Sequence, residues 1–339
     1  MKRSLFAAAP GRPSDPRRRR RPAFAAPLRR LLLVLALLGP AAAGADDVRE
    51  FVVTLDVTAG RSLAVTVYEP PSPCDGCALI VFSHGANAAP SRYRRLLRAW
   101  AAAGFLVAAP LHVDSELHPR RDDFDRDQVR TTRVEDVALI AGGGALPALL
   151  RQRGIEIGAE VVAAGHSYGA LIAQVAAGAR FQGDQQRPAS FAAPGNLAAV
   201  VALSPPGPLE GFVTAEDWTG VAAPMLVVTG TTDILPGFVD DWRAHLVSFE
   251  SAAAAPAYAL VYDNQDHYFN GAFGRPRERL DDRTARALAS LNRNVLSFLS
   301  QVLAGEPPGV DAWLALDDDL ADARVSDYTR ETVFKGGKQ

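Results

Sequence analysis

The sequence predicts an α/β fold with a mostly parallel sheet covered by helices on both faces. Three observations support this prediction: short apolar runs alternate with longer helical segments, several apolar runs stop at a polar or glycine-rich turn, and the short turn Ala59-Gly60 joins the first two runs. Alternating strands and helices favour parallel pairing, whereas so short a turn requires an antiparallel hairpin. We therefore expect the sheet to begin antiparallel and to continue parallel.

Eight strands and five helices are expected from the periodicity of the apolar residues. The strands are Phe51–Thr58, Ser62–Tyr68, Ala78–Ser83, Phe105–Leu111, Val161–Gly165, Ala198–Ser204, Pro224–Thr229 and Ala257–Tyr262. The helices are Ser91–Ala103, Val129–Arg153, Tyr168–Ala177, Phe238–Phe249 and Asp281–Ala304. Gly142-Gly143-Gly144 predicts a break or kink inside the second helix.

Three regions divide the chain: residues 1–45, 46–304 and 305–339. The first contains the basic block Arg17–Arg21, the apolar run Leu31–Leu38 and the small-residue stretch Ala41–Ala45. This order is typical of a secretory signal peptide, here with an extended basic n-region and cleavage near Ala45. The apolar run is too short for a permanent membrane span. We expect one secreted or periplasmic globular domain without a stable membrane anchor, and a tail that docks partly on it through a short helix around Trp313.

The charge of the mature part disfavours some partners. Without the first 45 residues, which carry ten basic residues and one acidic residue, the formal charge changes from −2 to −11. A surface this acidic disfavours nucleic acid and anionic membranes. No cofactor and no metal is predicted. Asp123, Asp125 and Asp127 alternate as in a calcium loop, but Gly is absent at the turn position and Val134 stands where a bidentate Glu is needed.

Cys74 and Cys77 form a C-x-x-C pair between two expected strands. A thioredoxin-like pair would stand at a helix N-terminus, which the flanking prolines and the following strand argue against. In an oxidising compartment the better interpretation is a small local disulfide.

The stretch Val161–Ala170, VVAAGHSYGA, is an apolar run followed by GHSYG and a small-residue helix. This pattern is typical of a strand, a sharp turn and a helix, with Ser167 at the apex. Gly165 and Gly169 are needed there because a Cβ would collide with the tightly packed turn. We predict that Ser167 presents a nucleophilic hydroxyl at the top of the sheet. The alternative is a glycine-rich turn with a solvent-facing serine.

A serine hydroxyl needs a histidine to take its proton and an acid to orient that histidine. Asp233 ends a polar turn after one expected strand, and His267 lies in the loop after the next. Both follow Ser167 in the order serine, acid, histidine. The other five histidines are not expected to act as the base. His84 and His112 lie upstream at strand ends, and His118 lies in a charged loop. His166 occupies the free position of the elbow, and His245 lies in an expected helix. His245 is interpreted as a surface or packing residue. The rival acids are Asp240, Asp241, Asp263 and Asp266.

Acyl transfer also requires hydrogen-bond donors aimed at the developing oxyanion. One should be the backbone N–H of Tyr168, directly after the nucleophile. The run ALIVFSHGA at residues 78–86 places a second loop after an early strand, and the N–H of Ala86 is the second candidate.

Together these segments resemble the α/β-hydrolase superfamily over about Ser62 to Ala304. The nearest likeness is to bacterial dienelactone-hydrolase-like and platelet-activating-factor-acetylhydrolase-like serine esterases. It rests on VFSHGA, GFLVAAPLH, GHSYG, VVTGTTD and DHYF. The resemblance implies an α/β-hydrolase fold and a serine carboxylic ester hydrolase with Ser167, Asp233 and His267 as its triad. True dienelactone hydrolases use cysteine where this chain has serine, so dienelactone itself is an unexpected substrate.

The segments that connect the expected strands after Ser167 are too short to contain a large helical cap domain. An open cleft for a small-molecule, lipid or polymeric ester is therefore expected. The candidate lining residues, each near a strand end or in a following loop, are Asn87, His112, Trp218 and Tyr268. Two alternatives stay open: a non-catalytic binding protein of the same fold, and an amidase or acyltransferase using the same triad. The sequence leaves the oligomeric state open.

Overall fold

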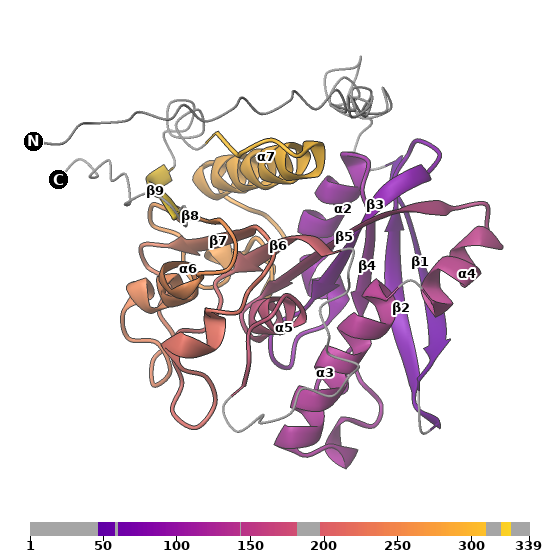
Figure 1. Ribbon diagram of the computed structural model, residues 1–339, viewed down its shortest axis with the longest axis horizontal. Helices are drawn as coiled ribbons and strands as arrows, with labels where there is room; N and C mark the ends of the chain where they lie inside the picture. The colour runs from indigo at the N-terminus through magenta and orange to yellow at the C-terminus, as the bar shows by residue number, and fades with distance from the viewer. Residues whose placement is uncertain (1–46, 58–59, 143, 182–196, 310–319, 327–339) are drawn as a thin grey trace, which may run out of the picture.

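The computed structural model describes residues 47–57, 60–142, 144–181, 197–309 and 320–326 (Figure 1). Nine strands form one sheet in the order β1-β2-β4-β3-β5-β6-β7-β8-β9. The strands are β1 (Arg49–Asp56), β2 (Ser62–Glu69), β3 (Asp75–Ser83), β4 (Leu106–Pro110), β5 (Glu156–His166), β6 (Leu197–Leu203), β7 (Met225–Gly230), β8 (Ala257–Tyr262) and β9 (Leu320–Ser326). The α-helices are α2 (Arg94–Ala102), α3 (Arg126–Ala141), α4 (Ala145–Arg151), α5 (Tyr168–Ala176), α6 (Val247–Ser251) and α7 (Asp282–Ala304).

The strand pairing confirms the predicted fold class. β1 and β2 pair antiparallel, β2 pairs antiparallel with β4, and β3 to β8 are joined by parallel pairing. All eight expected strands lie in this sheet. The ninth, β9, pairs antiparallel with β8 and comes from the tail. Trp313, where the sequence predicts a short docking helix, lies outside the described residues, as does the whole leader including Ala45.

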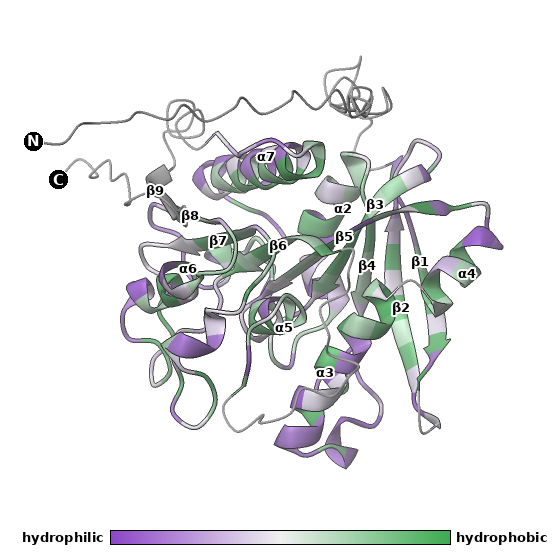
Figure 2. Cartoon of the chain, in the orientation of Figure 1, coloured by the Kyte–Doolittle hydropathy of each residue, from purple (hydrophilic) through white to green (hydrophobic). Residues whose placement is uncertain are grey.

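Helices cover both faces of the sheet, as Figure 1 shows. On one face α2 and α7 pack on one apolar cluster, and on the other α3, α4, α5 and α6 pack on a second. Figure 2 shows hydrophobic colouring along the central strands and hydrophilic colouring on the outer surface of α7 and at the far end of α3. This pattern follows from the sequence, because strands buried on both faces need nearly continuous apolar runs.

Two expected helices differ from prediction. The segment Val129–Arg153 is broken into α3 and α4 at the triglycine, as anticipated, but α3 begins earlier, at Arg126. The carboxylate of Asp125 accepts a hydrogen bond from the Gln128 N–H, and the Gln128 side chain accepts one from the Asp125 N–H. This capping box stabilises the start of α3. It gives Asp125 a structural role other than calcium binding.

The expected helix Phe238–Phe249 is wrong. Leu235 and Val239 form a small antiparallel bridge, then η8 (Trp242–Leu246) makes a 3-10 turn, and only α6 is α-helical. The apolar period predicts a helix, but the backbone groups of Leu235 and Val239 bond to each other across a tight turn instead. The difference matters for His245, which lies in η8.

Cys74 and Cys77 form a disulfide, as the sequence predicts. Among the described residues, no helix combines the length and hydropathy that a bilayer span requires. Residues 204–224 between β6 and β7 contain a small antiparallel bridge, Leu209 with Val213, and the short 3-10 helix η7 (Ala215–Trp218), which agrees with the expected lack of a large cap at that point.

Candidate active site

Ser167 sits between β5 and α5 in a strained backbone conformation. Its φ is 54° and its ψ is −123°, a combination that non-glycine residues rarely adopt. A Cβ on Gly165 would lie 2.3 Å from the Gly169 carbonyl oxygen, and one on Gly169 would lie 2.0 Å from the Ser83 carbonyl oxygen. Neither separation is possible, so the turn requires glycine at both positions. Strand β5 therefore meets α5 and the end of β3 at very close range.

The Ser167 backbone is anchored while its side chain is left half-buried. Its N–H donates to the Leu203 carbonyl at the end of β6, 2.9 Å away. Among the residues that the structure describes, Ser167 Oγ has no hydrogen-bond partner. Catalytic hydrogen bonds are often long before substrate arrives, so this leaves the hydroxyl available for proton transfer.

Asp233 and His267 lie in hydrogen-bond contact, 2.8 Å between Oδ1 and Nδ1. The turn after β7 and the loop after β8 are joined, because the Thr232 N–H donates to the Gln265 carbonyl. Thr229 Oγ1 donates to the other carboxylate oxygen of Asp233, 2.9 Å away. Both Asp233 and His267 are buried. The carboxylate thus fixes the imidazole through Nδ1, and the Nε2 of His267 has no partner among the described side chains and backbone.

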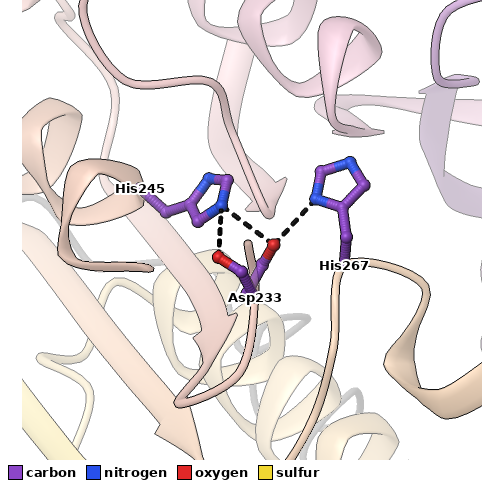
Figure 3. A group of neighbouring side chains, drawn as sticks. All are labelled: Asp233, His245 and His267. Atoms are coloured by element: carbon purple, nitrogen blue, oxygen red, sulfur yellow. Dashed lines mark hydrogen bonds and ion pairs between the residues drawn. The ribbon is translucent and has the colours of Figure 1, made fainter. Parts of the chain in front are cut away.

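His245 is the third group on this carboxylate, and Figure 3 shows it opposite His267 across Asp233. Its Nε2 lies 2.9 Å from Asp233 Oδ1, and its Nδ1 lies 2.6 Å from the Pro205 carbonyl oxygen. Of the two interpretations of His245, a surface or a packing residue, the surface one is therefore wrong, because His245 is fully buried beside Asp233. Burial alone would raise the pKa of Asp233, but hydrogen bonds from His245 and His267 outweigh burial and hold that pKa well below its usual range.

The rival acids make other contacts. Asp240, Asp241 and Asp263 are exposed, and Asp241 pairs with Arg243 in its own turn. Asp266 accepts hydrogen bonds from the Tyr268 and Asn270 N–H groups and so shapes the loop that carries His267.

Asp233, His245 and His267 also come close enough to suggest a cation site, with ligand atoms within 4.8 Å of one another. However, Asp233 Oδ1 lies 2.8 Å and 2.9 Å from the two nitrogens, which are hydrogen-bond distances. Zinc ligands lie at about 2.0–2.2 Å from the metal, and here the carboxylate oxygen itself stands where the two nitrogens converge. The arrangement is that of a hydrogen-bonded cluster.

Two unpaired backbone donors lie near Ser167. Within the described residues, neither the Ala86 N–H nor the Tyr168 N–H has an acceptor. Their segments are in contact, because Gly169 packs directly on the Ser83 and His84 carbonyls at the end of β3. The arrangement can therefore offer two donors to a substrate oxygen beside the serine.

Comparison with known proteins decides the family. The sequence profile of the alpha/beta hydrolase family matches residues 80–337. The chain belongs to the alpha/beta hydrolase family. This membership confirms the resemblance predicted from the sequence and the predicted enzyme class, a hydrolase. A search of curated proteins finds no match for this hydrolase.

Solved structures share its fold at low identity. Esterase 2 of Thermogutta terrifontis has a TM-score of 0.52 and 17% identity, over 74% of this chain and 92% of the esterase. The same esterase phosphorylated by paraoxon gives 0.51 and 16%, over 77% and 95% of the two chains. A Klebsiella pneumoniae protein assigned to the dienelactone hydrolases gives 0.52 and 16%, over 75% and 99%.

The hydrolase contains a fully buried arginine that sequence reasoning missed. Arg133 of α3 donates to the His84 and Gly85 carbonyls, 2.7 Å and 3.1 Å away, and its guanidinium lies over the Tyr168 ring at 4.8 Å. It also pairs with both carboxylate oxygens of Asp114 at 2.8 Å and 2.9 Å. Arg133 therefore ties the loop after β3 to the start of α5. Its position in a polar helix resembles that of an ordinary surface arginine, so only the fold identifies it.

Two of the four candidate lining residues of the hydrolase are wrong. His112 is fully buried, with Nε2 2.9 Å from Ser83 Oγ and Nδ1 2.8 Å from Asp136. Trp218 is also fully buried and donates to the Gln174 side chain. Both follow strands, but the chain packs them inward, where their polar atoms need interior partners.

The other two candidates, Asn87 and Tyr268, are at least partly exposed to solvent. Asn87 is exposed beside Ala86, and its N–H donates to Asp114. The half-buried Tyr268 ring lies 5.1 Å from the His267 ring.

His166, set aside by sequence reasoning as the free position of the elbow, connects three parts of the site. The Gly85 N–H donates to the Tyr93 hydroxyl, which in turn lies 2.9 Å from His166 Nδ1. His166 Nε2 lies 2.7 Å from the His267 carbonyl, and since a carbonyl only accepts, Nε2 carries the proton. Burial lowers the pKa of His166 to about 3, so it stays neutral and Tyr93 donates to Nδ1.

Proposed function

We propose that this protein hydrolyses carboxylic esters through an acyl-enzyme, with Ser167 as nucleophile, His267 as general base and Asp233 as the acid that orients it. The observation that carries the proposal is the buried Asp233–His267 hydrogen bond, together with the contact of the His267 carbonyl with His166, the residue before the strained Ser167. An ordinary glycine-rich turn has no need of a strained serine next to an oriented imidazole.

In the first half of the reaction, Ser167 Oγ attacks the ester carbonyl while His267 Nε2 takes its proton. The Ala86 and Tyr168 N–H groups stabilise the oxyanion. Collapse of the tetrahedral intermediate breaks the ester C–O bond, and His267 returns the proton to the departing alcohol.

In the second half, His267 takes a proton from water, which attacks the acyl-enzyme. Collapse of the second intermediate releases the carboxylic acid and returns the proton to Ser167 Oγ. Asp233 stays ionised throughout and stabilises the imidazolium that forms in each half. The esterase neighbours, one of them phosphorylated by paraoxon, support this chemistry by analogy of fold.

The first test is labelling with a fluorophosphonate, which reports an activated serine without the natural substrate. The expected result is one adduct per molecule by intact mass, placed on Ser167 by peptide mapping, and none on the matched variant Ser167→Ala. A folded wild-type protein that takes no adduct would overturn the proposal in favour of a non-catalytic binding protein.

A second test separates ester from amide chemistry. We expect turnover of p-nitrophenyl acetate or butyrate and far slower turnover of the matched p-nitroanilides. Asn87 and Tyr268 are proposed to line the part of the site that binds the acyl or the alcohol group of the ester. Asn87→Ala and Tyr268→Ala should therefore change the ratio of the KM values for short and long esters. Preference for the anilides, or for an added alcohol over water, would assign an amidase or an acyltransferase instead.

Export is the remaining part of the proposal. The division of the chain into a leader (1–45), a catalytic domain (46–304) and a tail (305–339), and the Cys74–Cys77 disulfide, suit a secreted or periplasmic protein. N-terminal sequencing of protein recovered outside the cytoplasm should begin near Asp46. A protein that keeps its first 45 residues in the cytoplasm would contradict this part alone.

A further inference from the structure

His245 stands in a setting where both of its ring nitrogens face oxygen atoms that accept hydrogen bonds. Nδ1 lies 2.6 Å from the Pro205 carbonyl oxygen. Nε2 lies 2.9 Å from Asp233 Oδ1 and 3.2 Å from the Asp233 carbonyl oxygen. A neutral imidazole has one N–H and one bare lone pair. Either neutral tautomer would therefore place a lone pair against an oxygen in a fully buried position.

We propose that His245 is a doubly protonated positioning residue that holds the Asp233 carboxylate in place for His267. This inference rests on the proposed function, since it takes Asp233 as the acid of the triad. With His245 and His267 on Oδ1 and Thr229 on Oδ2, the carboxylate is held from three directions. His245 is in turn held by the Pro205 carbonyl just after β6.

The charges around His245 agree with this assignment. The ionisable groups that face it are Asp233 on the β7 turn and His267 on the β8 loop, with His166 beyond; Asp241 and Arg243 in its own turn are exposed. Burial alone would lower the pKa of His245, but the hydrogen bond and charge of Asp233 outweigh burial and raise it. One carboxylate and one imidazolium together make a buried pair with no net charge.

The arrangement has a consequence for the reaction. The His245 and His267 rings lie 5.7 Å apart and nearly parallel, so a positive charge on His245 opposes the gain of a proton by His267. A merely space-filling His245 would have no such effect.

The first measurement is two-bond 1H–15N correlation NMR of histidine-labelled wild-type protein, which needs no substrate. His245 is identified by the signals that disappear in His245→Gln, or by connection to its own backbone if that variant does not fold. We expect both ring nitrogens of His245 to be protonated at pH 7.5. A neutral tautomer at that pH would overturn the proposal, whatever the protein's activity.

The second measurement is the pH profile of kcat/KM on p-nitrophenyl acetate. In His245→Gln the acid limb should move to higher pH by roughly one unit, because a neighbouring positive charge is lost. The matched control His118→Gln, in a surface loop, should leave the limb in place. An unmoved limb in a folded His245→Gln would overturn the positioning role. Absence of turnover in the wild-type protein would instead count against the proposed function, while the NMR result still decides the state of His245.

Discussion

His166 Nε2 donates a hydrogen bond to the backbone carbonyl of His267, 2.7 Å away, so the residue before Ser167 holds the backbone of the residue proposed to take its proton. The Tyr93 hydroxyl completes the chain by linking His166 to the Gly85 N–H. The elbow, the β8 loop and the loop after β3 are thereby joined through one neutral imidazole.

The buried His166 should make stability depend on pH. Its pKa is about 3 in the folded state but near 6.5 when unfolded. Below pH 6.5 the unfolded chain therefore binds a proton that the folded chain does not, and stability falls as the pH falls toward 3. Between pH 7 and pH 5 the free energy of unfolding, measured with urea, should fall by about 1–2 kcal/mol less in His166→Gln than in the wild-type protein. Equal losses in the two proteins would show that His166 is protonated in the folded state.

Removal of the side chains proposed as the triad should abolish turnover without unfolding the chain. Ser167→Ala and His267→Ala are each expected to lower kcat by about 10⁴-fold or more, and Asp233→Asn by about 10⁴-fold, because the amide favours the wrong tautomer of His267. The matched control Asp241→Asn removes an exposed acid and should keep kcat. Near-normal turnover by His267→Ala would mean that another group is the base.

Arg133 should support the proposed oxyanion donors through the loop after β3. Arg133→Met leaves the His84 and Gly85 carbonyls without a donor and Asp114 without its bidentate partner. We expect kcat to fall about 10²-fold, as for loss of an oxyanion donor, with KM little changed. Stability should fall by about 1–3 kcal/mol, because buried carbonyl groups and the part-buried Asp114 lose their donor. The control on the same helix is the exposed Arg126→Met, and equal effects of the two variants would contradict a role for the buried network.

Gly169 should tolerate no side chain. A Cβ there would lie 2.0 Å from the Ser83 carbonyl oxygen, so Gly169→Ala must displace either the elbow or the end of β3. The expected result is loss of fluorophosphonate labelling together with a lower melting temperature. Gly144→Ala is the matched control, because a Cβ at that position meets nothing within 4 Å. Normal labelling of Gly169→Ala would mean that the turn is less tightly packed than described.

Much of the site could be predicted because its elements carry local signals. The glycines around Ser167 are dictated by a turn only a few residues long, and Asp233 and His267 each follow an apolar strand directly. The ends of neighbouring parallel strands meet at one edge of the sheet, so chain order sufficed to pair these residues. The disulfide was also local, since Cys74 and Cys77 are three residues apart.

The sequence alone determined the fold class, the alternation of strands and helices, and the placement of Ser167, Asp233 and His267 each just after a strand, because these depend on periodicity and on turns of a few residues. Only the tertiary structure decided which polar residues are buried together. His245, His166 and Arg133 are separated in the sequence from the groups that they hold, and the interior positions of His112 and Trp218 depend on packing between distant strands and helices. A buried polar atom takes its partner from whatever the fold brings within hydrogen-bond distance, and no local pattern of residues records that choice.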